Sequence, residues 1–195
     1  MQKVNDQFNN QELTVLLREL GQVLVMDVLG DIVELGCYKG LTSIQIGKAL
    51  KLAGSSKKLY LYDSFDGLPE KVKQDESPAG LQFKAGELPA SKQEVVTLFK
   101  KSNLPPPVIK KAWFRDLKVK DLPEKVAFAF LDGDFYESIK DSLELVWPLL
   151  SPGSVVVVDD YQNEALPGAQ KAVDEWLKSH PGVLRTEASL AVISV

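Results

Sequence analysis

The stretch DIVELGCYKGLTS, residues 31–43, decides the fold of this 195-residue chain. It begins with a short, otherwise apolar strand that contains Glu34, and a glycine-rich turn from Gly36 to Gly40 follows directly. A helical pattern over residues 41–52 comes next. A buried strand, a glycine turn and a helix in this order predict the first unit of an α/β fold.

The same alternation of short apolar runs and helical patterns continues to the end of the chain. Further strands are predicted at 59–63, 108–111, 126–131 and 154–158, and two closing strands within 184–195 with a turn near Ala188-Ser189. Helices are predicted at 10–26, 91–101, 136–149 and 169–179. Continuous apolar runs suit strands that are buried on both faces of a parallel sheet. We therefore expect one domain over residues 1–195, with residues 1–30 as an amino-terminal helical segment.

The composition is that of an ordinary soluble protein, with 45% hydrophobic and 26% charged residues. Apolar runs are too short for a membrane span, and the polar start at residues 1–6 predicts no secretory leader. The single cysteine, Cys37, excludes an internal disulfide and fits the cytoplasm. A net charge of -4 without a basic cluster argues against nucleic acid or anionic lipid as a partner. We expect a small-molecule partner and a possible homodimer.

One long connection interrupts the alternation. Residues 65–90 are polar and rich in Pro, Gly, Lys and Glu, and connections of this length are usually functional or disordered. We interpret them as a lid-like insertion that covers a substrate, with Phe83, Glu87 and Leu88 facing it. Trp147 and Trp176 lie within helical patterns and are expected in the core or at an interface.

The glycine-rich turn is a candidate ligand site, because open parallel sheets bind ligands at the carboxyl ends of their strands. Gly36 and Gly40 would let backbone approach a ligand without a Cβ in the way. Their G-x-x-x-G spacing is neither the dinucleotide fingerprint nor a phosphate-binding P-loop. Glu34 could bind a cation or an amine. The alternative is a glycine pair that only shapes the turn.

Asp63 ends the second strand, where carboxylate oxygens are well placed for ribose hydroxyls. Together with the glycine turn, it suggests a nucleoside-containing ligand. The alternative is that Asp63 only caps the turn that follows it.

Four carboxylates follow the next two strands: Asp132 and Asp134 after the fourth, Asp159 and Asp160 after the fifth. Like charges crowded at one sheet edge repel one another unless a cation neutralises them. Because all candidate ligands are oxygens, Mg²⁺ is favoured, with Mn²⁺ or Ca²⁺ possible, over Zn²⁺. The structural alternative, helix capping, suits Asp134 or Glu137 but explains the Asp159-Asp160 pair poorly.

Several segments resemble a known family. They are VELGCYKGLTS (33–43), YDSFDGLPE (62–70), AWFRD (112–116), FLDGDFYES (130–138), SPGSVVVVDDY (151–161) and AVDEW (172–176). In these segments the chain resembles the macrocin O-methyltransferases, which act on sugar hydroxyls of antibiotics, and is more distantly similar to catechol O-methyltransferase. The resemblance implies the Rossmann-like class I methyltransferase fold, with strand order 3-2-1-4-5-7-6 and the last strand antiparallel.

The resemblance also implies an activity, a metal-dependent methyl transfer from S-adenosylmethionine to a small-molecule hydroxyl of a sugar or a phenolic natural product. Cofactor contacts are implied for Glu34, Gly36, Tyr38, Gly40, Ser43, Asp63, Ser64, Trp113, Phe114, Arg115, Asp116 and Asp132. Mg²⁺ ligands are implied at Asp132, Asp159 and Asp160.

The chain departs from these families at three positions. Ala112 and Leu117 stand where a glycine and a threonine are usual near the adenine, and Phe135 stands where catechol-type enzymes supply a lysine base. Asp132 or Asp134 is therefore our hypothesis for the catalytic base. Two other functions stay open, a non-catalytic module that binds S-adenosylmethionine and another nucleotide-dependent enzyme on a Rossmann-like fold.

Overall fold

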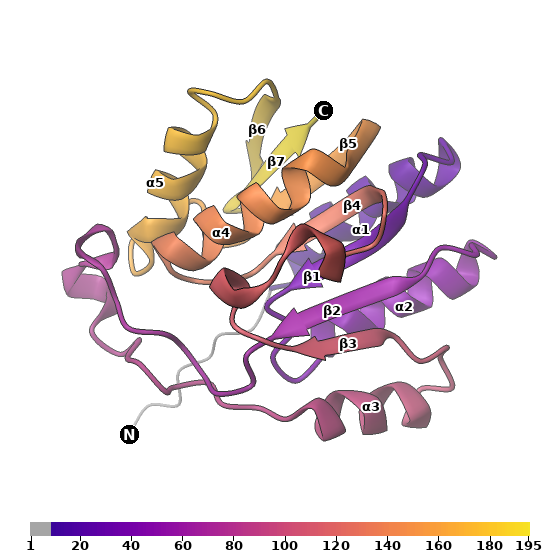
Figure 1. Cartoon of the computed structure of the whole chain (residues 1–195), viewed down its shortest axis with the longest axis horizontal. Helices are drawn as coiled ribbons and strands as arrows, with labels where there is room; N and C mark the ends of the chain where they lie inside the picture. Colours follow the sequence, from indigo (N-terminus) through magenta and orange to yellow (C-terminus); the bar gives the residue numbers. More distant parts are fainter. Residues whose placement is uncertain (1–8) are drawn as a thin grey trace.

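A computed structural model describes residues 9–195 as one seven-stranded sheet between two layers of helices (Figure 1). The strands are β1 (Asp31–Leu35), β2 (Leu59–Asp63), β3 (Val108–Lys111), β4 (Val126–Leu131), β5 (Leu150–Val158), β6 (Val183–Glu187) and β7 (Leu190–Ser194). Their order is β3-β2-β1-β4-β5-β7-β6. The first five strands are parallel, and β7 is antiparallel to both of its neighbours. This order confirms the predicted α/β fold; the segment for which no leader was expected, residues 1–6, lies outside the described residues.

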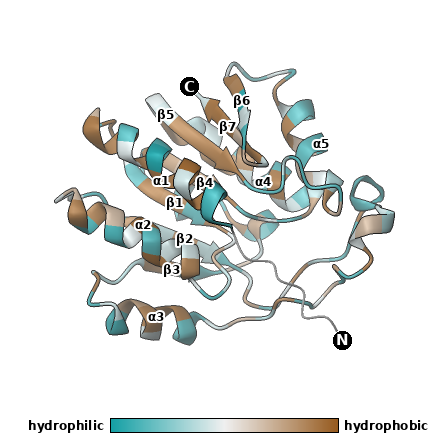
Figure 2. Cartoon of the chain, turned by 180° about the vertical axis from the view of Figure 1, so that it is seen from behind, coloured by the Kyte–Doolittle hydropathy of each residue, from teal (hydrophilic) through white to brown (hydrophobic). Residues whose placement is uncertain are grey.

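Helices cover both faces of the sheet. They are α1 (Asn10–Val25), α2 (Leu41–Leu52), α3 (Lys92–Lys101), α4 (Tyr136–Val146) and α5 (Pro167–Trp176). The first three pack with one face of the strands, and α4 and α5 pack with the other. Figure 2 shows apolar and polar residues alternating along α2 and α3, as expected of helices with one buried side. From residue 9 onwards, the helices are too short or too polar to cross a membrane.

The two cores meet across β4, which is buried along its whole length. Phe128 and Phe130 point into the core under α1 and α2, whereas Ala129 and Leu131 point into the core under α4 and α5. Each fully buried phenylalanine contributes roughly 1.5–3 kcal/mol relative to an exposed one. The central strands are thereby fixed, and their carboxyl ends form a rigid edge.

The start of β5 differs from its prediction. The strand begins at Leu150 rather than Ser154, because a bulge lets Leu150 pair with Val126 while Val155 pairs with Phe128. The Ser154 hydroxyl closes the bulge by accepting from the Ser151 N–H and donating to the Val126 carbonyl. The hydrogen bond from Ser154 to Val126 joins residues that are 28 positions apart, and the local sequence does not report it.

The helix ends also differ slightly from their predictions. The helix predicted for 136–149 is α-helical to Val146 and ends in a 3₁₀ turn around Pro148, which has no N–H for the i−4 hydrogen bond. Helix α5 begins two residues early, at Pro167, because proline is favoured at the first helical position.

Trp147 and Trp176, which were expected in the core or at an interface, pack together in the core under α4 and α5, where Trp147 is partly buried. Their ring centroids are 5.0 Å apart in an edge-to-face arrangement, and Trp176 is buried. The ring of His180 stacks on Trp176 at 4.2 Å. The lone histidine of the sequence therefore closes the carboxyl end of α5, far from the acidic strand ends.

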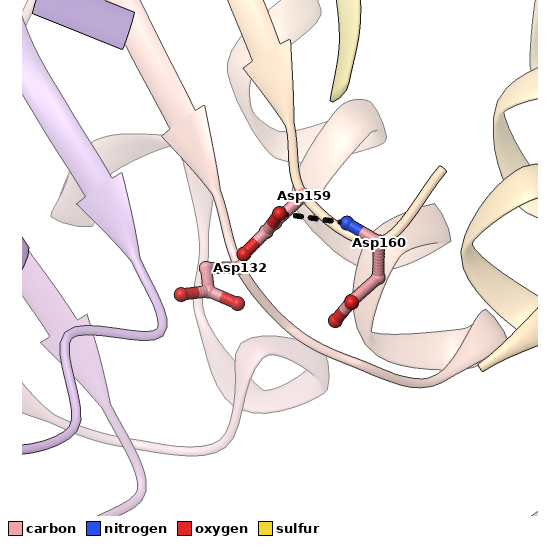
Figure 3. Close-up of side chains that lie close together, drawn as sticks. All are labelled: Asp132, Asp159 and Asp160. Atoms are coloured by element: carbon pink, nitrogen blue, oxygen red, sulfur yellow. Dashed lines mark hydrogen bonds between the residues drawn. The ribbon is translucent and has the colours of Figure 1, made fainter. Parts of the chain in front are cut away.

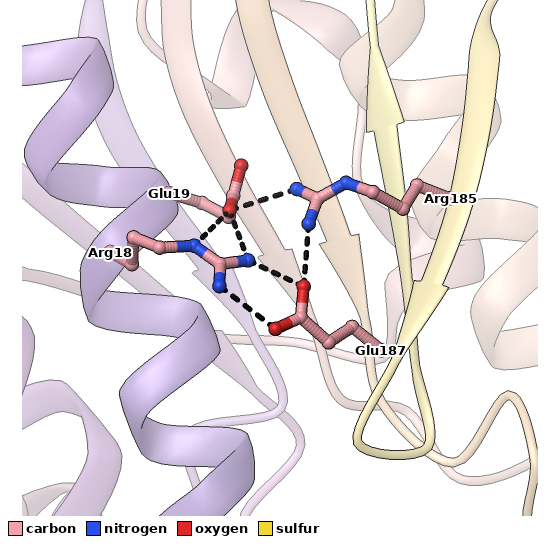
Figure 4. A network of polar contacts seen from close by, with 4 residues as sticks. All are labelled: Arg18, Glu19, Arg185 and Glu187. Atoms are coloured by element: carbon pink, nitrogen blue, oxygen red, sulfur yellow. Dashed lines mark hydrogen bonds and ion pairs between the residues drawn. The ribbon is translucent and has the colours of Figure 1, made fainter.

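The closing hairpin β6–β7 is tied to α1 by an ionic network (Figure 4). Ala188 and Ser189 form its turn at positive φ, where the sequence predicted a turn. The buried carboxylate of Glu19 lies 2.8 Å from Arg18 and 2.8 Å from Arg185, and Glu187 pairs with both arginines. Because both arginines are substantially exposed, the network orients the hairpin more than it stabilises it.

Gly36 provides a test of the close approach between the ends of β1 and β4. Its φ is +99°, and a Cβ there would lie 1.7 Å from the Asp132 carbonyl oxygen. We expect Gly36→Ala to lower the free energy of unfolding by about 3 kcal/mol or more, measured by urea denaturation. Gly21→Ala in α1, where nothing lies within 4 Å, should be neutral or stabilise by up to about 1 kcal/mol. Equal stability of the two variants would contradict this contact.

Candidate active site

A cavity opens at the carboxyl ends of β1, β2 and β4. The residues predicted for the cofactor that line it are Gly36, Tyr38, Asp63, Ser64, Trp113, Phe114 and Asp132. Asp134, one of the two candidate bases, also lines it. Residues that are 98 positions apart in the sequence thus form a single wall, because parallel strands end at the same edge of a sheet.

The glycine turn is held in an unusual backbone shape. Gly36, Tyr38 and Gly40 all have positive φ, at 99°, 46° and 81°. The Tyr38 N–H donates to Asp63 Oδ2 at 2.7 Å, which ties the turn to the end of β2. The turn is therefore shaped by the carboxylate of a neighbouring strand as well as by its own glycines.

Asp63 fills the capping role considered for it, and its side chain also faces the cavity. Its Oδ1 accepts from the Phe65 N–H at 2.6 Å, so it caps the following turn. Burial raises the pKa of Asp63, and the hydrogen bonds from the Phe65 and Tyr38 backbones oppose that rise. Both oxygens retain acceptor capacity, and the side chain lines the cavity, where a hydroxyl could donate to it.

Glu34 lies beneath the turn rather than in the cavity wall. It is 1% exposed and Ser43 is 0% exposed. The two side chains lie close together, but within residues 9–195 neither Glu34 Oε2 nor Ser43 Oγ makes a hydrogen bond of ordinary geometry. Burial raises the pKa of Glu34 to about 8, opposed by the nearby Ser43 hydroxyl. A buried carboxyl oxygen without a partner is costly, so this site favours either a proton or a cationic group.

Residues 112–115, which follow β3, line two different pockets. Trp113 and Phe114 line the cavity together with Ala112, which gives an apolar slot suited to a flat ring. Arg115 lies over the Trp113 ring at 5.6 Å and faces a second, outer pocket against the insertion. Arg115 and the exposed Asp116 do not line the main cavity, although the resemblance had implied adenine contacts for both. Gly40 and Ser43 also lie outside its lining.

Three carboxylates converge next to the cavity (Figure 3). One oxygen each from Asp132, Asp159 and Asp160 lies within 4.8 Å of the others. The Asp160 N–H donates to Asp159 at 2.8 Å, and the Asn163 amide donates to Asp160 at 2.7 Å. An all-oxygen set at this spacing fits a hard divalent cation, whose ligands lie about 2.0–2.6 Å from the ion.

The insertion is a packed wall rather than a free flap. Leu68, Pro69 and Leu88 line the cavity. Phe83, which was expected to face the substrate, is instead buried against Phe135. Glu87 also lies outside the cavity lining, and its carboxylate accepts from the Lys84 N–H. Apolar contacts with a distant loop decide these positions, and sequence patterns do not report them.

Sequence reasoning missed several lining residues. Gly133 and Ser138 face each other, since a Cβ on Gly133 would lie 2.8 Å from the Ser138 Cβ. Gly67 lies where the two ends of the insertion meet. A Cβ at this position would lie 2.5 Å from the Glu87 carbonyl oxygen. The signal for both glycines was the repeated Asp-Gly pair after β2 and β4.

A family model described as macrocin O-methyltransferase matches residues 8–185. The chain belongs to this family. It is 33% identical over 161 residues to a rhamnosyl-tetracenomycin C 4'-O-methyltransferase of Streptomyces olivaceus, covering 79% of this chain and 60% of that protein. Identity to mycinamicin III 3''-O-methyltransferase of Micromonospora griseorubida is 30%, covering 78% and 62%. The chain thus spans about 60% of the length of these relatives.

Solved structures share this fold. The O-methyltransferase NovP superposes with a TM-score of 0.80 at 27% identity, over 93% of this chain and 78% of that one. The calicheamicin methyltransferase CalS11 superposes with a TM-score of 0.78 at 21% identity, over 96% and 80%, and shows the shared fold.

The buried Glu34 predicts a pH-dependent stability. Because its folded pKa of about 8 lies above the ordinary value of 4.5, the folded chain holds a proton that the unfolded chain releases between these values. Its contribution to stability should therefore fall as pH rises through this window. Glu34→Gln should not lose stability in this way. The free energy of unfolding of the variant minus that of the parent should therefore rise by at most about 1.4 kcal/mol per pH unit.

Urea denaturation at pH 5, 6, 7 and 8 measures this difference. Glu124→Gln on the exposed surface is the matched control and should follow the parent at every pH. If the Glu34→Gln and parent curves ran parallel, Glu34 would not carry the proton.

Proposed function

We propose that this protein is an S-adenosylmethionine-dependent O-methyltransferase that acts on a hydroxyl of a sugar or another natural product. The proposal rests on one edge of the sheet, where two groups of residues form the two halves of a site. A glycine turn, Asp63 and an aromatic slot form one half, and three converging carboxylates form the other.

The first half fits S-adenosylmethionine. Gly36 leaves space where any Cβ would collide with backbone, and Asp63 offers acceptors for ribose hydroxyls. Trp113 and Phe114 provide an apolar surface for adenine. Glu34 would supply the negative charge for the methionine ammonium group from beneath the turn, losing its own proton as the amine binds.

The second half fits a divalent cation, for which we propose Mg²⁺ held by Asp132, Asp159 and Asp160. When bound, this cation lowers the pKa of the acceptor hydroxyl and fixes its direction. Asp134 would take the hydroxyl proton, with Asp132 as the alternative base. The new carbon–oxygen bond forms as the carbon–sulfur bond breaks, leaving S-adenosylhomocysteine. The wall formed by Leu68, Pro69 and Leu88 would exclude water from the transfer.

The acceptor class is proposed from the relatives. Their names specify a rhamnosyl sugar in one case and a mycinamicin in the other. We propose a small glycosylated acceptor for this chain, a cytoplasmic location and a homodimer, and we expect no nucleic-acid partner.

Cofactor binding is tested by calorimetry with S-adenosylhomocysteine. We expect micromolar binding by the parent and at least a tenfold loss in Asp63→Ala, which removes the ribose acceptors and the hydrogen bond that shapes the turn. Exposed Asp66→Ala, three residues further on, should bind within about twofold of the parent. NADH should not bind. Absence of any heat with S-adenosylhomocysteine would refute the proposal.

The metal half is tested separately by Mn²⁺ binding, followed by electron paramagnetic resonance. Asp159→Ala and Asp160→Ala should each weaken Mn²⁺ at least tenfold and abolish methyl transfer to rhamnosyl glycosides, while S-adenosylhomocysteine still binds. Asp174→Ala on α5 is a carboxylate control outside the cluster. Unchanged Mn²⁺ affinity in both cluster variants would make the three aspartates structural.

A further inference from the structure

Asp134 lies at the centre of a tight, strained turn. The Phe135 N–H donates to the Gly133 carbonyl at 2.6 Å, which closes a three-residue turn around Asp134. Asp134 has a φ of 59° and is 9% exposed. A turn of this kind with positive φ at a non-glycine residue is rare and costs of order 1–3 kcal/mol. Such a conformation persists only where the surroundings hold it.

A residue from the insertion holds the far side of this turn. Helix α4 begins at Tyr136, and its cap residue is Phe135, whose side chain cannot accept a hydrogen bond. Asp75 takes over this role from 61 residues away, since its Oδ1 accepts from the Tyr136 N–H at 2.7 Å. Asp75 Oδ2 accepts from the Val72 N–H at 3.0 Å. The carboxylate is 2% exposed, so these bonds are shielded from water.

The side chain of Phe135 is fixed by the same insertion. It is 1% exposed and packs in a small cluster with Leu68 and Phe83 of the insertion and Leu166 of the loop after β5. Asp75 therefore holds the backbone after the Asp134 turn, and this cluster holds the side chain. The turn has little room to relax on that side.

Helix α5 packs tightly against the same hydrogen bond. A Cβ on Gly168 would lie 1.8 Å from Asp75 Oδ1 and 2.7 Å from the Tyr136 nitrogen. Only glycine allows α5 to approach the carboxylate and its donor this closely. The contact thus offers a second way to disturb the bond without changing Asp75 itself.

We propose that Asp75 is a positioning residue, which clamps the start of α4 from the insertion and thereby holds the strained turn that directs the Asp134 carboxylate into the cavity. The clamp itself concerns only the backbone geometry around Asp134 and the start of α4. Its catalytic consequence rests on the proposed function, in which Asp134 is the base.

Hydrogen exchange followed by mass spectrometry tests the clamp directly. In Asp75→Ala, amides of residues 133–139 should exchange at least tenfold faster than in the parent, while amides of residues 31–40 keep the parent rate. Gly168→Ala should produce the same local change, because its Cβ displaces the Asp75 carboxylate. Asp75→Asn should restore much of the protection, because its Oδ1 can still accept from Tyr136.

Ser77→Ala is the matched control from the same segment. Its hydroxyl donates to the Glu164 carbonyl, so it joins the insertion to the same loop without touching α4. If the amides of residues 133–139 exchanged at the parent rate in both Asp75→Ala and Gly168→Ala, the proposed clamp would be overturned. Equal loosening by Ser77→Ala would also overturn it, because general packing of the insertion would then hold α4.

Methyl transfer to rhamnosyl glycosides tests the catalytic consequence. We expect kcat of Asp75→Ala to fall about 10- to 100-fold, with the KM for S-adenosylmethionine within about threefold of the parent and partial rescue in Asp75→Asn. A rise in the KM for S-adenosylmethionine without a fall in kcat would contradict a positioning role for Asp75. Failure of the parent to bind S-adenosylhomocysteine would instead count against the proposed function, and hydrogen exchange would still decide the clamp.

Discussion

The contact between Gly36 and the Asp132 carbonyl is the constraint on which the site depends. The end of β1 and the end of β4 approach so closely there that no side chain fits between them. The Asp132 N–H also donates to the Leu35 carbonyl at 2.8 Å, which continues the ladder up to the cavity. The glycine turn and the first acidic residue are therefore fixed relative to each other by backbone contacts.

Several strained turns lie near this edge of the sheet. Tyr38, Phe65, Leu88, Asp134 and Asp160 all have positive φ although none is glycine, and they lie in the turns or the insertion around the cavity. Such residues need support from their surroundings. The support comes from carboxylates that accept backbone N–H groups and from buried rings. The turns around the cavity are thus held by contacts within the protein, which favours a single geometry for a ligand.

Apart from Glu19, which is paired with arginines, two kinds of acidic side chain support the site. Asp63 and Asp75 accept from backbone N–H groups of segments distant in sequence, and so join the glycine turn and the insertion to the strand ends. Glu34 has an oxygen that makes no hydrogen bond of ordinary geometry within residues 9–195, and it has a raised pKa. The first kind is satisfied by the fold. The second kind is satisfied by a proton or by a cationic ligand, which links its charge to the ligand that the cavity holds.

The sequence by itself determined the α/β alternation, the strand order through the family resemblance, and the meeting of Asp132 with the Asp159-Asp160 pair. These follow because short apolar runs report burial locally and because parallel strands bring their carboxyl ends to one edge. Only the tertiary structure decided that Phe83 is buried, that Arg115 faces an outer pocket and that Asp75 caps a helix 61 residues away. Those three outcomes depend on which distant surfaces pack together, and a local sequence pattern does not specify which residues will pack against it.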